Sequence, residues 1–319
     1  MRSLSYPDFQ QHRDRFDHLV ARDDEVAALC SSSAWQIAAH EGLHEGAGRG
    51  RELIWLDPSY AFLASLHDNG CYFPLEQGWL FGCQLIGDPA NKLDWFIQRA
   101  AEEGLSPFAV AFGGIKVGGK LEAQLRDRRR EWIQYQEFDG TDCMIVDLRD
   151  GVEAWLARRS KKFRRSIRGC LAIEGIEIED ARDEEPEHLI ERILAIQRQT
   201  YKWKQGDDIF QQEQFSRFYI HLITSLSRSG KLRALFAVRD GKDLAHITGG
   251  VFENTYRGLQ MSYIEEAKPL SLGNRLQVES MGQCWSEKIT HYDLGMHSTY
   301  KDRWADHRER YRIILVQFF

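Results

Sequence analysis

The sequence lacks any apolar run long enough to cross a membrane. Its first residues, MRSLSYPDFQQHRDRF, are polar and contain no hydrophobic segment of the kind found in secretory signals. It also lacks an excess of basic residues, since the formal net charge is −6. A negative net charge argues against non-specific DNA binding, although it leaves room for a local basic site. We therefore expect no membrane span, no signal peptide and no DNA partner.

Motifs that mark several classes of site are missing as well. The cysteines form no CxxC pair and no Cys/His cluster with metal-ligand spacing, so we predict no metal site and reduced, buried cysteines. The Gly-rich stretch 42–50 lacks the GxGxxG and Walker spacings and is typical of a surface loop. No GxSxG elbow occurs, so a hydrolase triad has no support. The cysteines are Cys30, Cys71, Cys83, Cys143, Cys170 and Cys284.

What is present is typical of a globular protein. The chain has 319 residues, of which 43% are hydrophobic and 28% charged, enough for one large domain or two of ordinary size. Helix and strand patterns follow the same coarse order twice, with helices, a strand hairpin, then a helix and further strands. No residue-level repeat accompanies this order. The pattern predicts an α/β (α+β) chain of two halves.

In the first half, turn signals separate short β-type runs, and amphipathic stretches alternate with them. The basic run Arg126–Arg130 is interpreted as a solvated helix end, with phosphate or tRNA binding as the alternative. The expected strands are Glu52–Leu56, Ala61–Leu66, Gly70–Leu75, Phe108–Phe112, Trp132–Phe138 and Cys143–Leu148, and the expected helices are 90–104 and Leu121–Arg130.

A strongly basic segment opens the second half. Residues 158–168 carry seven positive charges within a helix predicted over 151–170. These charges extend over three helical turns and cannot all share one face. Two interpretations remain open, a solvated basic face or a binding site for an anionic substrate or an RNA end.

The most informative stretch runs from His246 to Trp304. Two β-type runs, 245–252 and 256–264, precede a turn and a helix predicted over about 275–288. Gly273 lies at the mouth of this helix, where free N–H groups and the positive end of the helix dipole favour an anion. An ordinary turn capped by Ser271 or Asn274 is the alternative.

The order of these pieces resembles the C-terminal half of the GNAT-like acyltransferases of the CelD/BioF2 type, which are relatives of the FemABX peptidyltransferases. Trp155 and Ser160-Lys161-Lys162-Phe163-Arg164-Arg165-Ser166-Ile167-Arg168 resemble the family's opening helix. Asp240-Gly241-Lys242, followed by His246 and Gly249-Gly250, resembles its hairpin. Tyr292-Asp293-Leu294-Gly295 and Tyr300-Lys301-Asp302-Arg303-Trp304 resemble its ending. Pro269-Leu270-Ser271-Leu272-Gly273-Asn274 occupies the family's SPG-x-L position, although Pro and Gly are not adjacent here.

The resemblance implies two tandem GNAT-like halves, each a mixed, mostly antiparallel sheet flanked by helices. The halves would be 1–150 and 151–319, with the acyl donor in the second. It further implies a cytoplasmic N-acyltransferase that moves an acyl group from acyl-CoA to an amine of a small or saccharide-linked acceptor, without a metal. Two alternatives remain: a FemABX-type transferase that uses aminoacyl-tRNA, and a non-catalytic double-GNAT binding module.

The same resemblance supplies the candidate site residues. Lys301 would stabilise the developing oxyanion or a phosphate, Tyr300 would orient it or donate a proton, and Asp293 would fix the loop or bind the amine. His246 and His297 are base candidates because histidine titrates near neutrality. The donor would rest on Ser271, Leu272, Gly273, Asn274 and Arg275, and the acceptor on Tyr201, Trp203, Tyr263 and Glu265.

Overall fold

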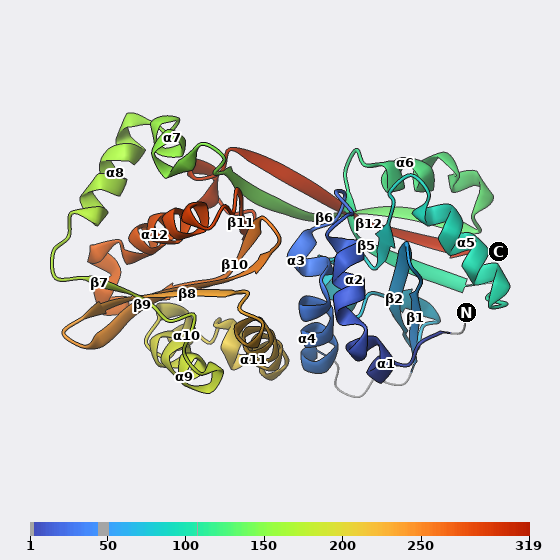
Figure 1. The fold of residues 1–319 in the computed structure, drawn as a ribbon, viewed down its shortest axis with the longest axis horizontal. Helices are drawn as coiled ribbons and strands as arrows, with labels where there is room; N and C mark the ends of the chain where they lie inside the picture. Colours follow the sequence, from blue (N-terminus) through green and yellow to red (C-terminus); the bar gives the residue numbers. More distant parts are fainter. Residues whose placement is uncertain (1–2, 44–50, 107) are drawn as a thin grey trace. The chain divides into compact units, whose positions relative to one another are not determined.

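The computed structural model describes residues 3–43, 51–106 and 108–319, so the Gly-rich stretch expected as a surface loop lies largely outside the described residues. The chain divides into two compact units, residues 1–142 with 309–319 and residues 143–308. The chain leaves the first unit through β6 (Gln134–Asp147) and returns to it through β12 (His307–Phe318) (Figure 1). Because β12 returns to the first unit, that unit consists of two separate stretches of the chain.

The first unit has a mixed sheet in the order β1-β2-β3-β5-β12-β6, with β4 paired to β2. β3 and β5 pair in parallel, whereas β1–β2, β2–β3, β2–β4 and β5–β12 pair antiparallel. Its other strands are β1 (Glu52–Leu56), β2 (Tyr60–Leu66), β3 (Cys71–Phe73), β4 (Leu85–Gly87) and β5 (Phe108–Lys116). Its helices are α1 (Tyr6–Gln11), α2 (Arg13–Val20), α3 (Ala28–Ser31), α4 (Ser33–Leu43), α5 (Lys92–Glu102) and α6 (Lys120–Asp127).

The second unit has the order β6-β11-β10-β9-β8-β7, in which only the β10–β11 pair among the described pairs of this unit is parallel. Its strands are β7 (Glu177–Asp180), β8 (Leu232–Arg239), β9 (Lys242–Phe252), β10 (Thr255–Tyr263) and β11 (His291–Met296). Its helices are α7 (Gly151–Ala157), α8 (Lys161–Leu171), α9 (Pro186–Gln197), α10 (Tyr201–Gln205), α11 (Glu213–Arg228) and α12 (Leu272–Ser286).

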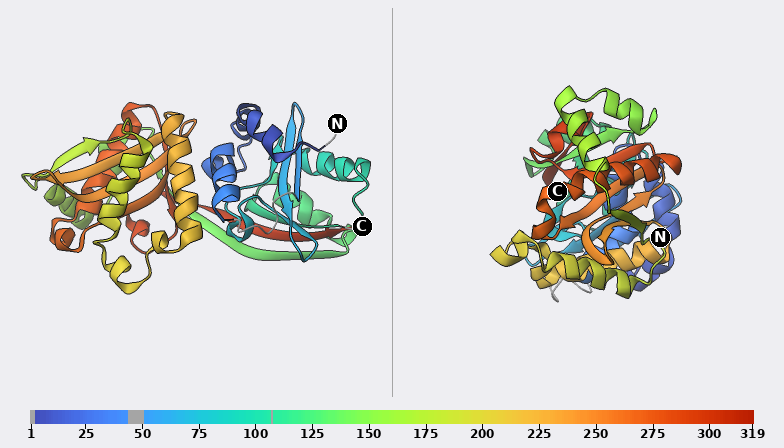
Figure 2. Two further views of the ribbon diagram at one scale, coloured as in Figure 1. Left: turned by 90° about the horizontal axis from the view of Figure 1, so that it is seen from below. Right: turned by 90° about the vertical axis from the view of Figure 1, so that its left-hand side faces the viewer.

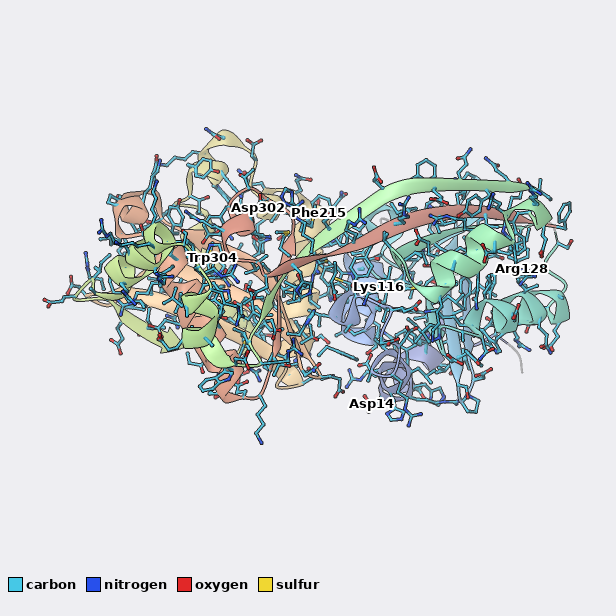
Figure 3. The ribbon with its side chains drawn as sticks, turned by 90° about the horizontal axis from the view of Figure 1, so that it is seen from above. Asp14, Lys116, Arg128, Phe215, Asp302 and Trp304 are labelled. Carbon is cyan, nitrogen blue, oxygen red and sulfur yellow. The ribbon has the colours of Figure 1, made fainter. Side chains whose placement is uncertain are left out.

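Helices cover both faces of the second unit's sheet, with α12 on one face and α9 to α11 on the other (Figures 1 and 2). On the α12 side, Trp155 and Trp304 stack with ring centroids 5.5 Å apart, and the Trp155 indole N–H donates to the Trp304 carbonyl at 3.0 Å. Figure 3 labels Trp304 in the segment that follows β11. This buried contact fixes the segment 300–304 against the helical layer.

The second unit departs from its predicted elements at two helix starts. The basic helix expected over 151–170 is two helices, because Ser160 leaves the helical conformation and its hydroxyl accepts the Phe163 N–H at 3.2 Å as an N-cap. The helix expected from about 275 begins at Leu272 after Ser271, whose φ is +50°. In addition, the separate strands expected at 132–138 and 143–148 form one strand, β6.

All six cysteines are free and buried, as predicted. Among the described residues, no helix combines the length and apolar character needed to span a bilayer.

Candidate functional site

β10 and β11 separate shortly after they meet. They pair in parallel only where Thr255–Arg257 faces His291–Asp293. β10 then has an irregularity between Gly258 and Gln260, and continues to Tyr263 paired with β9. β11 has one between Asp293 and Met296, where Met296 pairs with Cys143 of β6. The two strands therefore open into a gap, which we name the unit-2 fork.

Two glycines line the base of the unit-2 fork. Gly295 has a φ of +82°, a conformation that other residues adopt only with strain. A Cβ atom at this position would lie 3.5 Å from both the Gly258 carbonyl oxygen and the Lys301 ammonium. Glycine at 295 therefore allows the turn and leaves room for the ammonium at the base of the fork.

Charged groups at this base carry a positive excess. Arg257 Nη1 lies 2.5 Å from Asp293 Oδ2, and the Asp293 Oδ1 atom accepts the Gly295 N–H at 2.6 Å. Lys301 donates to the Met296 carbonyl at 2.8 Å. Burial lowers the pKa of Lys301 to about 8, against the opposing attraction of Asp293 and with a further lowering by Arg257. Two cations thus share one carboxylate in a partly desolvated place.

The first turn of α12 carries backbone donors. Within the described residues, the N–H groups of Leu272 and Gly273 have no hydrogen-bond acceptor, as expected for the first residues of a helix. Gly273 packs closely on β10, because a Cβ there would lie 3.2 Å from the Met261 methyl carbon. Ser271 makes no side-chain cap, so the alternative of an ordinary capped turn is not realised through its hydroxyl.

Tyr300 connects this helix start with the Lys301 segment. Its hydroxyl donates to Asn274 Oδ1 at 2.9 Å. Burial raises the pKa of Tyr300 to about 12, with a smaller opposing effect of Arg303, so the phenol keeps its proton at neutral pH. Arg275, which is expected to contact the donor, has a guanidinium that donates to the carbonyls of Ile173 and Ile176, at 2.8 and 3.2 Å.

The two candidate histidines lie in different surroundings. His246 is fully buried on β9, and burial lowers its pKa to about 3, so it stays neutral across the physiological range. Its Nε2 lies 3.4 Å from the Gln197 amide nitrogen, and among the described residues its Nδ1 has no partner. His297 is partly exposed, and its Nε2 lies 3.0 Å from Asp302 Oδ1.

The predicted acceptor residues lie at the end of β10 and on α10. The Glu265 N–H donates to the Gln199 carbonyl at 3.1 Å, and the Glu265 carboxylate pairs with Lys204. Tyr201 is half exposed at the start of α10, which Thr200 caps. These contacts join α10 to the segment between β10 and α12.

Sequence reasoning missed Arg257, Gly258 and Gly295. Nothing in the local pattern distinguished Arg257 from any other charged residue of a strand. Its function as the partner of Asp293 depends on the β10–β11 register, which pairs the two positions directly. The motif Tyr292-Asp293-Leu294-Gly295 did contain Gly295, and the glycine itself was the available signal.

The first unit has an equivalent parallel pair, but its gap is filled. Cys71 and Tyr72 of β3 pair with Ala109 and Val110 of β5. The segment 80–84 then occupies the gap beside β5. The Gly114 N–H donates to the Leu80 carbonyl at 3.0 Å, and the Gln84 amide group bonds with the Ala111 carbonyl at 2.7 Å and the Gly113 N–H at 3.0 Å.

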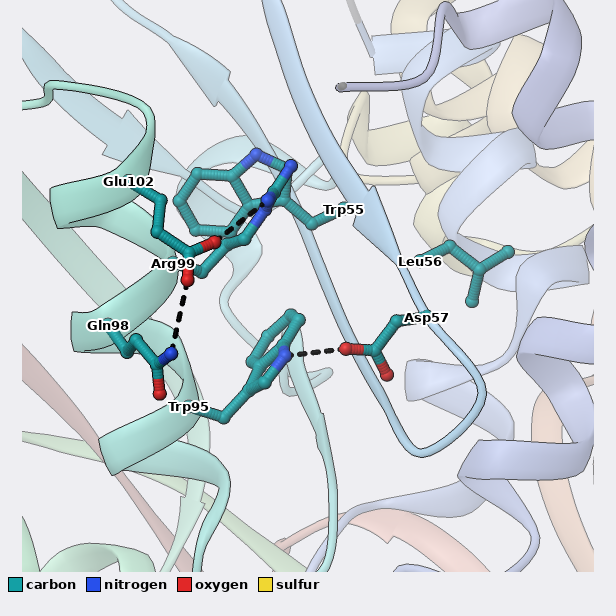
Figure 4. Close-up of a pocket in the computed structure, with 7 residues that line it drawn as sticks. All are labelled: Trp55, Leu56, Asp57, Trp95, Gln98, Arg99 and Glu102. Atoms are coloured by element: carbon teal, nitrogen blue, oxygen red, sulfur yellow. Dashed lines mark hydrogen bonds and ion pairs between the residues drawn. The ribbon is translucent and has the colours of Figure 1, made fainter. Parts of the chain in front are cut away.

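The first unit also has a cavity of about 220 Å³ beside α5, outside all predicted site residues (Figure 4). Its polar side chains largely bond to one another. The Trp95 indole N–H donates to Asp57 at 2.6 Å, and Arg99 and Gln98 both bond to Glu102, at 3.1 Å each. We assign no function to it. No group of His, Cys, Asp and Glu within the described ranges could hold a metal ion.

Comparisons with known proteins agree with this geometry. Residues 157–302 match the model of the acetyltransferase (GNAT) domain. FemX is 10% identical, with 98% of this chain and 97% of FemX covered at a TM-score of 0.70. A conserved Bacteroides thetaiotaomicron protein of unknown function is 13% identical, with 96% and 97% covered at 0.65. L-PGS from Bacillus licheniformis is 12% identical, with 94% and 90% covered at 0.58. No curated protein matches the sequence.

These identities are low, so the solved structures show the fold alone, and the family model shows a similarity that covers residues 157–302. The mixed, mostly antiparallel sheet flanked by helices confirms the predicted fold class. Residues 157–302 are therefore similar to the acetyltransferase (GNAT) domain, and over nearly its whole length the chain shares the fold of FemX.

Proposed function

We propose that the protein is an N-acyltransferase that moves an acyl group from acyl-CoA to the amine of a small or saccharide-linked acceptor in the cytoplasm. The observation that carries this proposal is the positive excess at the base of the unit-2 fork. A thioester carbonyl placed there would develop negative charge on its oxygen as the amine attacks. A preorganised ammonium stabilises that charge most effectively where water is excluded.

In this proposal Lys301 stabilises the oxyanion. Its Met296 carbonyl contact fixes the ammonium, and the Arg257–Asp293 pair keeps an additional charge beside it. The amine forms the C–N bond, the oxyanion collapses, and the C–S bond breaks to release the thiolate of CoA. Tyr300, which keeps its proton at neutral pH, is the proposed proton donor to that thiolate or the group that orients the donor.

The donor's pyrophosphate would rest on the first turn of α12. The N–H groups of Leu272 and Gly273 and the positive end of the helix dipole supply the attraction. Ser271 and Asn274 flank these donors, whereas Arg275 contributes indirectly by holding the segment after α8.

The acceptor amine must lose a proton before or during attack. We assign this step to His297, because Asp302 orients its ring and part of the ring reaches solvent. His246 is a poor proton acceptor, since a pKa of about 3 leaves it almost without basicity at neutral pH. Tyr201, Trp203, Tyr263 and Glu265 are the proposed acceptor contacts, because α10 is tied to the end of β10.

A second candidate uses an aminoacyl ester on tRNA instead of a thioester. It needs the same oxyanion stabilisation. The exposed cations of α8 favour it over the non-catalytic alternative, because no carboxylate among the described residues pairs with them. Acyl-CoA and aminoacyl-tRNA both present an ester-type carbonyl and phosphates, so binding experiments with each donor are needed to distinguish them.

Calorimetric titration of acetyl-CoA tests the proposal. We expect binding to the wild type and a loss of at least tenfold in affinity for Gly273→Val. The new side chain would press on Met261 of β10, next to the first turn of α12 to which we assign the pyrophosphate. Gly282→Val is the matched control in the same helix, since no atom lies within 4 Å of a Cβ at position 282. Absence of acetyl-CoA binding to the wild type would overturn the acyl-CoA proposal, and aminoacyl-tRNA would then be titrated.

A further inference from the structure

Two stretches of the sequence that the proposed reaction leaves unused meet at the segment that carries Lys301. The first contains Trp155, on α7, and Arg159, in the turn between α7 and α8. The second is the segment 301–306, which follows β11. The contacts between them join residues 146 to 149 positions apart in the chain. Only the folded unit therefore brings these two stretches together.

The backbone of this segment is held at successive residues. The Trp155 indole N–H donates to the Trp304 carbonyl at 3.0 Å. Arg159 donates from Nη1 to the Ala305 carbonyl at 2.8 Å, and its Nη2 pairs with the Asp306 carboxylate. The Arg159 guanidinium also lies over the Trp155 ring, with its central carbon 5.3 Å from the ring centroid. We name Trp155 and Arg159 the α7 clamp.

The clamped residues bond directly to the Lys301 backbone. The N–H groups of Trp304 and Ala305 both donate to the Lys301 carbonyl, at 2.9 and 3.1 Å. The Lys301 N–H donates in turn to the Ser298 carbonyl at 2.8 Å. A displacement of Trp304 or Ala305 would therefore displace Lys301, and its ammonium would lose the contact with the Met296 carbonyl.

Arg159 differs from the neighbouring Arg158 in burial and in partners, although both contact the Asp306 carboxylate. The Arg158 side chain is 40% exposed, whereas that of Arg159 is 11% exposed. The backbone carbonyl that Arg159 binds lies in the Lys301 segment, whereas the one that Arg158 binds, that of Asp147, lies in β6. Because burial of a guanidinium is costly unless hydrogen bonds compensate it, Arg159 has a defined place against this segment.

We propose that Trp155 and Arg159 are positioning residues for the reaction, and that they hold the Lys301 ammonium at the base of the unit-2 fork. The inference rests on the proposed function for its effect on the rate. Its effect on the ammonium does not depend on that function, because it follows from the contacts of the segment. We assign the α7 clamp no contact with the donor or the acceptor, so it acts through Lys301.

The surroundings of the ammonium predict what a loosened α7 clamp would do. Four charged or titratable side chains act on it, namely Asp293 of β11, Arg257 of β10, Cys143 of β6 and Lys202 of α10. Burial has the largest effect and lowers the pKa of Lys301 to about 8. A loosened segment would expose the ammonium to water, so its pKa would rise toward the ordinary lysine value of 10.5.

Competitive labelling with acetic anhydride tests this positioning without relying on activity. The labelled fraction of Lys301, read by mass spectrometry at a series of pH values, gives the pKa of its ammonium. We expect a pKa of about 8 in the wild type and a rise of roughly 0.5 to 1.5 in Arg159→Gln. Lys120, which is exposed in the first unit, is the internal reference and should label alike in every protein.

Kinetics with acetyl-CoA test the effect on the reaction. We expect Arg159→Gln to lower kcat roughly five- to twentyfold, because a displaced ammonium stabilises the oxyanion less. The affinity for acetyl-CoA should change by less than about threefold, since the α7 clamp holds the Lys301 segment and not the first turn of α12. In Lys301→Gln the same substitution should cost nothing further in kcat, because the group that Arg159 positions is then absent.

Three further variants control for charge and folding. Arg158→Gln removes the same charge from the same carboxylate and should leave kcat and the Lys301 pKa at their wild-type values. Arg159→Lys keeps the charge but lacks the planar fork, so it should show part of the change and guards against a folding defect in Arg159→Gln. Trp155→Phe removes the indole N–H and keeps an aromatic ring beside Trp304, so it should give a smaller change of the same sign.

The outcomes separate this inference from the proposed function. An unchanged Lys301 pKa in Arg159→Gln, or an equal rise in Arg158→Gln, would overturn the inference and leave the proposed function intact. A loss of kcat that Arg159→Gln causes in full in the Lys301→Gln background would also overturn it. A wild type that transfers no acyl group, while Arg159→Gln still raises the Lys301 pKa, would overturn the proposed function and support the α7 clamp.

Discussion

Each unit contains one short parallel strand pair, but the gap beside that pair is filled by the chain itself in the first unit and not in the second. In the second unit β10 and β11 diverge, and Lys301 occupies the base of the gap. In the first unit the segment 80–84 enters the corresponding gap and bonds to β5. The comparison indicates that one sheet pattern can serve as a ligand site or as a closed structural core, depending on whether the chain fills its own gap.

The glycines beside the two gaps differ in how much space surrounds them. A Cβ at Gly114 would come within 2.7 Å of Gly82 backbone, whereas one at Gly295 would meet only a carbonyl oxygen and a lysine side-chain end at 3.5 Å. The first contact is a collision inside packed backbone, and the second is ordinary contact at the border of open space. Substitutions at these two positions should therefore separate stability from ligand binding.

The largest effect is expected for Lys301→Ala. Loss of a preorganised oxyanion-stabilising group lowers kcat roughly 100- to 1,000-fold. Release of the CoA thiol, followed with a chromogenic disulfide, measures the rate, and acetyl-CoA affinity measured in parallel separates chemistry from binding. A variant with more than a third of the wild-type kcat would remove Lys301 from the mechanism.

Gly114→Val tests whether the segment 80–84 fills the gap of the first unit. Valine at a φ of +54°, with backbone less than 3 Å away, should lower the free energy of unfolding by roughly 2–4 kcal/mol. Urea denaturation measures this change. Gly78→Val is the control, because no atom lies within 4 Å of a Cβ there. Equal losses in both variants would show that segment 80–84 does not fill the gap as described.

Gly295→Val tests the second gap. The new side chain should weaken acetyl-CoA binding about tenfold or more, because it occupies the space between Gly258 and Lys301. Its positive φ also predicts some loss of stability, of roughly 1–2 kcal/mol. Calorimetry and urea denaturation on the same preparation measure both. Unchanged affinity would place the donor elsewhere.

The pH dependence follows from the lowered pKa of Lys301. Above a pH of about 8 the ammonium loses its proton, so oxyanion stabilisation and kcat should fall as pH rises through this value. Stability should change in the opposite direction. Between about 8 and the ordinary value of 10.5, the unfolded chain holds a proton that the folded chain has released, so the unfolding free energy should gain from rising pH.

We would measure the pH dependence of kcat and of the unfolding free energy in the wild type and in Lys301→Gln. The difference between the two proteins gives the contribution of Lys301, separate from that of other titratable groups. An alkaline limb of kcat that persists unchanged in Lys301→Gln would assign that limb to another residue.

The smallest effect is expected for Tyr300→Phe. If Tyr300 orients the donor, the substitution removes one hydrogen bond to Asn274, which corresponds to about 1 kcal/mol and roughly a fivefold loss of kcat. A loss of about 100-fold or more would instead identify Tyr300 as the proton donor. Asn274→Ala should give a similar loss, and the double variant should lose little more, because both substitutions break the same contact. Fully additive losses in the double-mutant cycle would show that the two side chains act independently.

The sequence predicted the local elements of both units, for a physical reason. Hydrophobic periodicity and turn residues report local preference, and they placed the β9–β10 hairpin and the helix before β11 with only small shifts. They could not show that Ser160 divides the basic stretch, because a serine flanked by basic residues also fits a continuous helix until the cap contact is known.

The site required contacts between distant residues. The pairing of Arg257 with Asp293 and the filling of the first unit's gap by Gln84 arise from register and from the path of the chain. Local pattern contains neither. The lowered pKa values of Lys301 and His246 likewise depend on burial in the folded unit. His246 and His297, which the sequence offers equally as base candidates, differ because only His246 is buried.

The central claim is that the donor binds in the unit-2 fork and not in the first unit's filled gap. Amide hydrogen exchange with and without acetyl-CoA, read by mass spectrometry on peptic fragments, tests it most directly. The account predicts slower exchange in residues 258–263, 271–276 and 293–301 and no change in 80–84 or 111–114. Protection of 80–84 or 111–114, or ligand binding without protection in the fork, would contradict it.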